Sequence, residues 1–185
     1  LIKRVKEVSK EKNLPSILLT YFPNPTIVLE KNKSLKSVYD QKIKKEIIEK
    51  FSVDMLLTIP FTHEFSQIHA YDFTKDILVD KLKAHHIIIG FNHFFGKGRQ
   101  GDFVFLQSHA EEFEYSVEKI DQVYAKDEPV SSSKIRSYIQ NGEVAKAKDL
   151  LTRPVILRGK IVEGFKRGRQ IGFPTANIQL SGDSL

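Results

Sequence analysis

The segment Ser16–Pro25 reads SILLTYFPNP, and its pattern sets the fold class. A short, continuously apolar run bounded by turn residues is typical of a strand that is buried on both faces of a parallel sheet. The two prolines flanking Asn24 cannot continue a strand, so the backbone turns sharply where the strand ends. In open α/β sheets the carboxyl ends of the strands form the edge at which ligands bind.

The rest of the first 125 residues repeats this pattern of strands and helices. Further buried strands are predicted at 54–60 (DMLLTIP) and 86–91 (HIIIGF), and one or two more at 113–117 and 120–124. Amphipathic helices are predicted at 1–13, at 34–51 and from an N-cap at Asp72 to residue 84. Strands alternating with helices indicate an α/β fold with a parallel, doubly wound sheet.

The segment Ser131–Arg136 reads SSSKIR and opens a predicted helix that Asn141 and Gly142 end. A serine N-cap, free N–H groups and an arginine one turn into the helix make a good phosphate receptor. A well-capped surface helix, with Arg136 in a surface ion pair, is the simpler alternative. After another short helix at 144–151, the residues 154–162 alternate like a half-buried antiparallel strand, which indicates the start of a second, β-type domain.

Composition narrows the function classes. The chain has no cysteine, which excludes disulfides and thiolate metal sites, and it has no signal-peptide pattern or apolar run long enough for a membrane span. A cytoplasmic protein with no membrane partner is expected. The net charge is +6, and two basic glycine-rich clusters, GKGRQG at 96–101 and KRGRQIG at 166–172, favour anionic partners.

Two apparent motifs do not support the function that their patterns suggest. Gly96, Gly98 and Gly101 match G-x-G-x-x-G, but the dinucleotide fingerprint opens a helix directly after the first strand, and these glycines follow the third. A metal site built from the histidines at 85, 86 and 93 is disfavoured, because adjacent strand residues face opposite ways and the zinc spacing is absent. The aromatic residues at 91, 94 and 95 either stack on a ligand or pack in the core.

Several stretches together resemble the bifunctional bacterial riboflavin kinase/FMN adenylyltransferase family, also called FAD synthetase. They are LLTYFPNP, DMLLTIPF, GFNHFFGKGRQGD, SSSKIRSYIQNGEVAKAKDLL and RGKIVEGFKRGRQIGFPTANI. The resemblance covers essentially the whole chain. It implies a Rossmann-like nucleotidyltransferase domain at 1–151, with a parallel doubly wound sheet, and the start of a β-barrel riboflavin kinase domain at 152–185. The implied reactions are phosphorylation of riboflavin to FMN and transfer of AMP from ATP to FMN, with Mg²⁺ as cofactor and FAD and pyrophosphate as products.

The resemblance also assigns site residues. Asn92 and Arg136 are the implied catalytic residues, and Thr175 and Asn177 are the implied ligands of magnesium and ATP. The implied nucleotide- and flavin-binding residues are Asn24, Asn92, Ser131, Ser132, Ser133, Arg136, Gly164, Gly168, Gly172, Pro174, Thr175 and Asn177. Alternative roles are a self-capped loop for Asn92 and strand-entry packing for Thr175 and Asn177.

Three departures from the family pattern bear on activity. The family's H-x-G-H turn would lie just before Leu1, and the bulk of the kinase barrel would lie beyond Leu185. Asn24 stands where the family usually has histidine, and asparagine can donate a hydrogen bond but cannot carry charge. A flavin- or nucleotide-binding module without turnover is therefore the alternative function. A nucleic-acid binder that uses the two basic loops ranks last, because no RNA-binding motif accompanies them.

Overall fold

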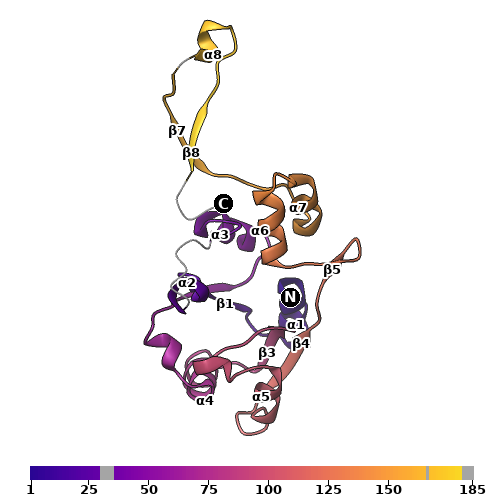
Figure 1. The fold of residues 1–185 in the computed structure, drawn as a ribbon. Helices are drawn as coiled ribbons and strands as arrows, with labels where there is room; N and C mark the ends of the chain where they lie inside the picture. The colour runs from indigo at the N-terminus through magenta and orange to yellow at the C-terminus, as the bar shows by residue number, and fades with distance from the viewer. Residues whose placement is uncertain (30–35, 166, 181–185) are drawn as a thin grey trace. The chain divides into compact units, whose positions relative to one another are not determined.

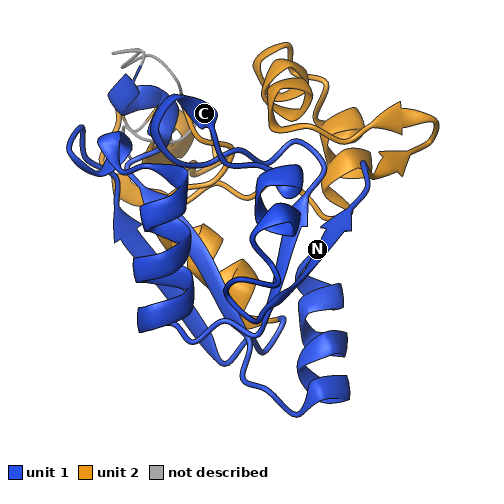
Figure 2. Ribbon diagram, turned by 90° about the horizontal axis from the view of Figure 1, so that it is seen from below, with its two compact units in different colours: residues 1–35, 51–122 blue, residues 36–50, 123–185 orange. Residues whose placement is uncertain are grey.

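The computed structural model describes residues 1–29, 36–165 and 167–180. The chain divides into two compact units (Figure 2). Unit 1 comprises Leu1–Leu35 and Phe51–Gln122, and unit 2 comprises Lys36–Lys50 and Val123–Leu185.

Unit 1 is a mixed α/β structure built on two parallel strand pairs (Figure 1). β1 (Ile17–Phe22) pairs with β2 (Met55–Pro60), and β3 (His86–Gly90) pairs with β4 (Ser116–Ile120). The parallel pairing predicted from the alternating pattern is confirmed. The strands nevertheless form two separate pairs within the described residues, and not one continuous sheet.

The helical segments of unit 1 are short. They are α1 (Ile2–Lys12), α2 (Pro25–Leu29), η1 (Phe65–Gln67), α4 (Ala70–Asp72), η2 (Phe73–Lys81), η3 (Lys97–Arg99) and α5 (Phe103–Ser108). α1 ends at Asn13, which has a positive φ of 51° and so closes the helix in the left-handed conformation. The helix α5 was not predicted, although Asp102 caps it by accepting a hydrogen bond from the Phe105 N–H.

The core of unit 1 lies where these helices meet β3. Its buried residues are Ala70, Phe73, Ile89, Phe95, Leu106 and Tyr115. Leu106 is 1% exposed, and its carbonyl oxygen accepts a hydrogen bond from the Tyr115 hydroxyl. Burial raises the pKa of Tyr115 to about 12, so this hydrogen bond persists across the physiological pH range.

The helix prediction at 72–84 was wrong in its start and its geometry. The helical segment begins at Ala70 with His69 as N-cap, and Asp72 lies inside it without a capping hydrogen bond from its side chain. From Phe73 onward the turns are wider π-helical turns. Thr74 is fully buried, and its hydroxyl donates to the Ala70 carbonyl, which satisfies the side chain inside the helix.

Three other boundaries differ from the prediction. The helix expected at 34–51 is confined to α3 (Gln41–Glu49), which Asp40 caps, and residues 34–35 lie outside the described part of the chain. The strand expected at 113–117 begins at Ser116, because the residues before it form turns. The alternation at 154–162 forms a strand only over β7 (Gly159–Val162).

Unit 2 contains α3, β5 (Tyr124–Ala125), β6 (Glu128–Pro129), α6 (Ser132–Gln140) and α7 (Val144–Leu151). The latter two helices bury Ile135, Ala147 and Leu150. Glu46 of α3 forms an ion pair with Arg158, which joins the two sequence segments of this unit. The unit continues into β7, α8 (Arg167–Gln170) and β8 (Asn177–Leu180), where β7 and β8 form an antiparallel hairpin with α8 near its tip (Figure 1). A barrel beyond this hairpin remains a prediction.

Candidate functional site

The amino end of α6 has the geometry expected of an anion-binding helix start. Ser131 is the N-cap, and its hydroxyl oxygen accepts a hydrogen bond from the Lys134 N–H at 3.2 Å. The side chains at 131–133 are exposed, so the first turn of the helix is open to solvent. Exposed N–H groups at the positive end of a helix dipole attract phosphate.

Arg136 lies one turn into α6 and turns back toward that helix start. Its guanidinium donates a hydrogen bond to the Ser133 hydroxyl at 3.2 Å. Within the described residues, Arg136 forms no ion pair with a carboxylate, so the surface ion pair that was the simpler alternative is not present. The arrangement leaves a positive charge and a hydroxyl together at the end of a helix.

The neighbouring lysine on α6 is already engaged. Lys134 forms an ion pair with Glu128 at 3.1 Å, and the Tyr138 hydroxyl donates to the same carboxylate at 2.8 Å. The hydrogen bond from Tyr138 and the charge of Lys134 lower the pKa of Glu128. Arg136 is therefore the basic side chain near the start of α6 that has no acidic partner among the described residues.

Asn92 and its neighbours lie just after β3 in unit 1. Asn92 is exposed in a turn that the hydrogen bond from the His93 N–H to the Gly90 carbonyl closes at 3.1 Å. Phe95 is only 7% exposed and belongs to the core, so it is not available to stack on a ligand. Phe91 is 45% exposed, and Phe94 has one face covered by Arg99 at 4.3 Å.

Asn24 has a local structural role. Its side-chain oxygen accepts a hydrogen bond from the Thr26 N–H at 3.0 Å, and its backbone carbonyl accepts one from Ile27 at 2.9 Å. These contacts cap the short helix α2. The position therefore favours a residue with a short polar side chain, whatever else it contacts.

The hairpin of unit 2 brings the glycine-rich loop against Thr175 and Asn177. The Phe173 N–H donates to the Gly168 carbonyl at 2.7 Å, which folds the loop back onto the segment before β8. A Cβ at Gly168 would lie 2.2 Å from the Phe173 carbonyl oxygen and 3.2 Å from the Thr175 hydroxyl. A Cβ at Gly164 would meet the Asn177 side chain. Gly172 has a φ of 80°, which a glycine adopts without strain.

Thr175 and Asn177 are the residues predicted to hold magnesium and ATP. Both side chains are exposed and offer neutral oxygens. No cluster of three or more histidine or acidic residues that would hold a metal ion occurs within the described residues. Magnesium usually takes few protein ligands and fills the rest of its coordination with water and substrate phosphates, so this donor set fits a magnesium–nucleotide complex rather than a free ion.

The structure thus places the predicted residues in three groups. Asn24 and Asn92 lie in unit 1. Unit 2 holds the other two groups, which are the serines at 131–133 with Arg136 and the glycine-rich loop with Thr175 and Asn177. Inside unit 2, the contacts of Gly164 and Gly168 with Asn177 and Thr175 join the members of the last group. No helix within the described residues is long and apolar enough to cross a membrane.

Comparison with known proteins gives the family. Residues 1–134 match the family model of FAD synthetase. The chain belongs to the FAD synthetase family. Residues 151–185 match a second model, that of riboflavin kinase.

The names of this chain's curated relatives mention both riboflavin kinase and FMN adenylyltransferase. The chain is 35% identical to the bifunctional riboflavin kinase/FMN adenylyltransferase of Listeria monocytogenes, over 100% of this chain and 59% of that protein. It is 29% identical to the protein of the same name from Escherichia coli K12, over 97% of this chain and 58% of the relative. The chain therefore spans about three-fifths of the length of these curated relatives.

A solved structure supports the fold. A Streptococcus pneumoniae protein described as a macrolide-efflux protein superimposes with a TM-score of 0.88 and 27% sequence identity, over 100% of this chain and 60% of that one. The agreement covers the mixed α/β architecture. The description of that protein differs from the names of the sequence relatives.

Proposed function

We propose that the complete protein makes FAD in two steps, phosphorylating riboflavin to FMN and then transferring AMP from ATP to FMN. The observation that carries this proposal is the FAD synthetase match over residues 1–134, which ends within the start of α6, where Arg136 lies beside Ser133. The riboflavin kinase match over 151–185 supports the first step. The partners are small molecules, and a cytoplasmic location stays a prediction.

The adenylyl transfer is an in-line displacement at the α-phosphorus of ATP. A phosphate oxygen of FMN attacks, the bond to the β-phosphate breaks, and pyrophosphate leaves. In such reactions the protein mainly positions the reactants and neutralises developing charge. Arg136, together with the exposed N–H groups and hydroxyls at 131–133, supplies positive charge and hydrogen-bond donors for the phosphate oxygens.

Asn92 and Asn24 are proposed to contact the nucleotide and flavin from unit 1. Asn92 is exposed directly after β3, at the strand end where α/β proteins bind ligands. Phe91 is exposed beside it and is the aromatic side chain of this segment best placed to stack on a ring. Asn24 already caps α2, so its contact with a ligand would come second to that local role.

The kinase step is assigned to the hairpin of unit 2. Thr175 and Asn177 are proposed to hold magnesium–ATP, while Pro174 fixes the approach of the segment before β8. Gly164, Gly168 and Gly172 would let the loop backbone approach the phosphates, since glycine has no side chain to keep them apart. Magnesium would supply charge neutralisation on the triphosphate.

Conversion of FMN to FAD tests this proposal. The complete protein is incubated with ATP, magnesium and FMN, and FAD is measured by chromatography. Arg136→Ala should lower kcat/KM by roughly 10²–10³, the usual cost of removing one preorganised electrostatic contact. Arg158→Ala, which removes an arginine paired with Glu46 in the same unit, serves as the charge-matched control and should retain activity.

Two results would count against the proposal. An Arg136→Ala variant with unchanged FAD formation contradicts the role of the α6 start. FMN binding without any FAD formation by the complete protein selects the alternative function, a flavin-binding module without turnover.

A further inference from the structure

One carboxylate, that of Glu128, holds the face of α6 that carries Lys134 and Tyr138. Glu128 lies in β6, which precedes the N-cap Ser131. The Tyr138 hydroxyl donates a hydrogen bond to the Glu128 Oε2 at 2.8 Å, and the Lys134 ammonium pairs with the same oxygen at 3.1 Å. The carboxylate therefore connects the segment before the helix with both the first and the second turn of the helix.

Arg136 leaves α6 from a different face. Side chains four residues apart on a helix are neighbours, whereas side chains two residues apart are not. Lys134 and Tyr138 can therefore share one carboxylate. Arg136, which lies between them in the sequence, instead turns toward Ser133. A contact that fixes the rotation of α6 about its own axis thus also fixes the direction in which the Arg136 guanidinium points.

The segment that carries Glu128 is anchored by backbone hydrogen bonds. β6 pairs with β5 in an antiparallel hairpin, in which Ala125 lies opposite Glu128. The Val130 N–H then donates to the Val123 carbonyl at 2.9 Å, so hydrogen bonding continues to the residue before the N-cap. Glu128 therefore projects from a hydrogen-bonded hairpin, which gives its carboxylate a defined place beside α6.

The protonation states of Glu128 and Tyr138 suit this contact at neutral pH. The hydrogen bond from Tyr138 and the charge of Lys134 lower the pKa of Glu128, and the hydrogen bond to Glu128 raises the pKa of Tyr138. Tyr138 therefore keeps its proton and donates, while Glu128 stays ionised and accepts. The Lys146 ammonium of α7 lies 5.5 Å from the centre of the Tyr138 ring and adds a cation–π contact.

These polar contacts are better suited to orient α6 than to keep it folded. The side chains of Glu128 and Lys134 are 43% and 33% exposed, and partly exposed ion pairs contribute little to stability. The buried side chain of Ile135 holds the helix in unit 2, where α6 packs against α7. Removing the Glu128 carboxylate should therefore leave α6 in place and loosen its orientation.

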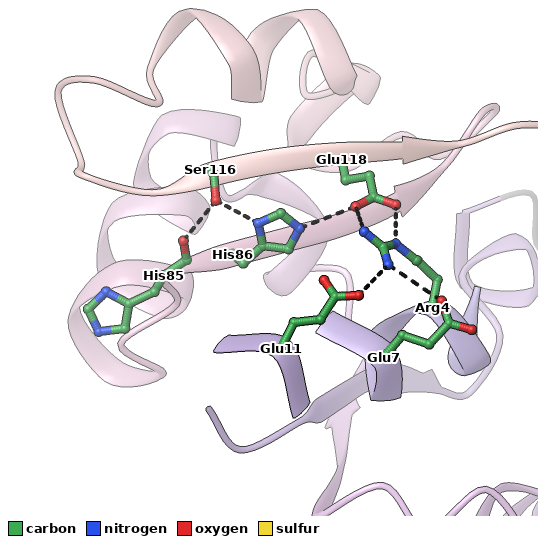
Figure 3. Close-up of polar contacts among 7 residues, drawn as sticks. All are labelled: Arg4, Glu7, Glu11, His85, His86, Ser116 and Glu118. Atoms are coloured by element: carbon green, nitrogen blue, oxygen red, sulfur yellow. Dashed lines mark hydrogen bonds and ion pairs between the residues drawn. The ribbon is translucent and has the colours of Figure 1, made fainter. Parts of the chain in front are cut away.

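Unit 1 contains a carboxylate network of a different kind (Figure 3). Glu118 of β4 accepts two hydrogen bonds from Arg4 of α1, at 2.9 and 3.2 Å, and lies 3.6 Å from the His86 ring of β3. Arg4 also pairs with Glu7 and Glu11 on its own helix. None of these five residues is a predicted site residue, so this network joins structural elements without orienting a site side chain.

We propose that Glu128 and Tyr138 are positioning residues for adenylyl transfer, and that their hydrogen bond sets the orientation of α6 in which Arg136 meets the phosphates of ATP. This role rests on the function proposed above. Neither residue touches the reactants, and both act through Arg136. A misplacement of about 1 Å can cost on the order of a hundredfold in rate, so a small rotation of α6 is enough to affect catalysis.

Double-mutant kinetics of FAD formation in the complete protein test this proposal. Tyr138→Phe removes only the hydroxyl and keeps the ring, and Glu128→Ala removes the carboxylate. Each change should lower kcat/KM by roughly ten- to a hundredfold. In the Arg136→Ala background each should lower it by less than about twofold, because the group that they orient is gone. Equal losses in the two backgrounds, which a general effect on folding would produce, overturn the proposal, as does an unchanged Tyr138→Phe variant.

Two carboxylate variants are the controls. Asp149 of α7 pairs with Lys126 in the turn between β5 and β6, so Asp149→Ala removes a lysine partner from the same hairpin and should leave kcat/KM unchanged. Glu118→Ala disrupts the network of unit 1 and should have the same effect with and without Arg136. An Asp149→Ala variant as impaired as Glu128→Ala overturns the proposal.

The positioning role and the proposed function fail in different ways. If Arg136→Ala leaves FAD formation unchanged, both are overturned. If Arg136→Ala impairs FAD formation while Glu128→Ala and Tyr138→Phe do not, the function stands and the positioning role is overturned.

Discussion

The two basic glycine-rich loops have similar compositions and different structures. The loop at 96–101 is fixed to unit 1: Phe95 and Gly101 exchange two hydrogen bonds of 2.9 Å, and the Lys97 N–H donates to the Ile68 carbonyl at 2.7 Å. The loop that follows β7 is bordered by apolar side chains open to solvent, with Phe165 88% and Phe173 75% exposed.

The difference shows that glycine serves two purposes in this chain. Gly96 and Gly101 are required by close packing, because a Cβ would lie 2.7 Å from the Ala70 Cα in one case and 2.5 Å from the Phe95 ring in the other. Gly164 faces the Asn177 side chain that is proposed to hold a ligand, whereas a Cβ at Gly168 would lie 2.2 Å from the Phe173 carbonyl oxygen. The first loop is therefore packed against the rest of unit 1, whereas the apolar side chains that border the second loop are exposed.

The largest expected effect on stability is at the first loop, residues 96–101. Gly96→Ala should lower the free energy of unfolding by about 2–5 kcal/mol, because it adds a clash with the Ala70 backbone to the cost of a side chain at a φ of 71°. Gly98→Ala is the matched control: its φ is 63°, but nothing lies within 4 Å, so only about 1–2 kcal/mol is expected. Urea unfolding measures both, and equal losses would contradict close packing at Gly96.

A smaller effect on stability is expected at the start of the β1–β2 pair, where Ser16 contacts Asp54. Hydrogen bonds from the Ser16 hydroxyl and N–H, with the contribution of Lys6, hold the pKa of Asp54 well below its usual range. A depressed carboxyl pKa contributes stability above the ordinary range near pH 4, and that stability is lost as the pH falls through the folded-state pKa. Ser16→Ala should therefore reduce the stability that is lost between about pH 5 and pH 2, because the variant lacks the hydroxyl hydrogen bond that lowers the pKa of Asp54. An unchanged pH profile in thermal unfolding would contradict this assignment.

The smallest effect on stability is expected at the second loop. Gly164→Ala should change the free energy of unfolding by no more than about 0.5 kcal/mol, because the Asn177 side chain that it meets is exposed and free to rotate away. The same change should lower riboflavin phosphorylation severalfold in the complete protein, since it displaces a proposed ligand of magnesium–ATP. A loss of stability comparable to that of Gly96→Ala would remove the distinction between the loops.

Much of the fold could be predicted from local patterns. The runs at 17–22, 55–60 and 86–90 are predominantly apolar and form strands, although most of their residues are only partly buried. The helix start at Ser131 carries a capping side chain that accepts the expected N–H group. Ala70 was missed as a helix start, because its N-cap, His69, makes no capping hydrogen bond that a sequence pattern would reveal. The π-helical turns after it depend on how Phe73 and Thr74 are buried, which is set by distant residues.

The site was predictable mainly through motifs. The capping pattern identified the α6 start, and the structure adds that Lys134 is paired with Glu128 while Arg136 turns toward Ser133. From the sequence alone, Phe95 could be assigned either to the core or to stacking on a ligand. In the structure its ring packs against Phe73 and Phe105, which lie on other segments of unit 1. The roles of Asn92, Thr175 and Asn177 stay predictions.

The most direct test of the account is a separation of the two proposed activities in the complete protein. FMN formation from riboflavin and FAD formation from FMN are measured for Arg136→Ala and Asn177→Ala with magnesium and ATP. Arg136→Ala is expected to lose FAD formation and keep FMN formation, while Asn177→Ala is expected to do the reverse. Loss of both activities in each stably folded variant, or of neither, would contradict the assignment of the two steps to the α6 start and to the β7–β8 hairpin.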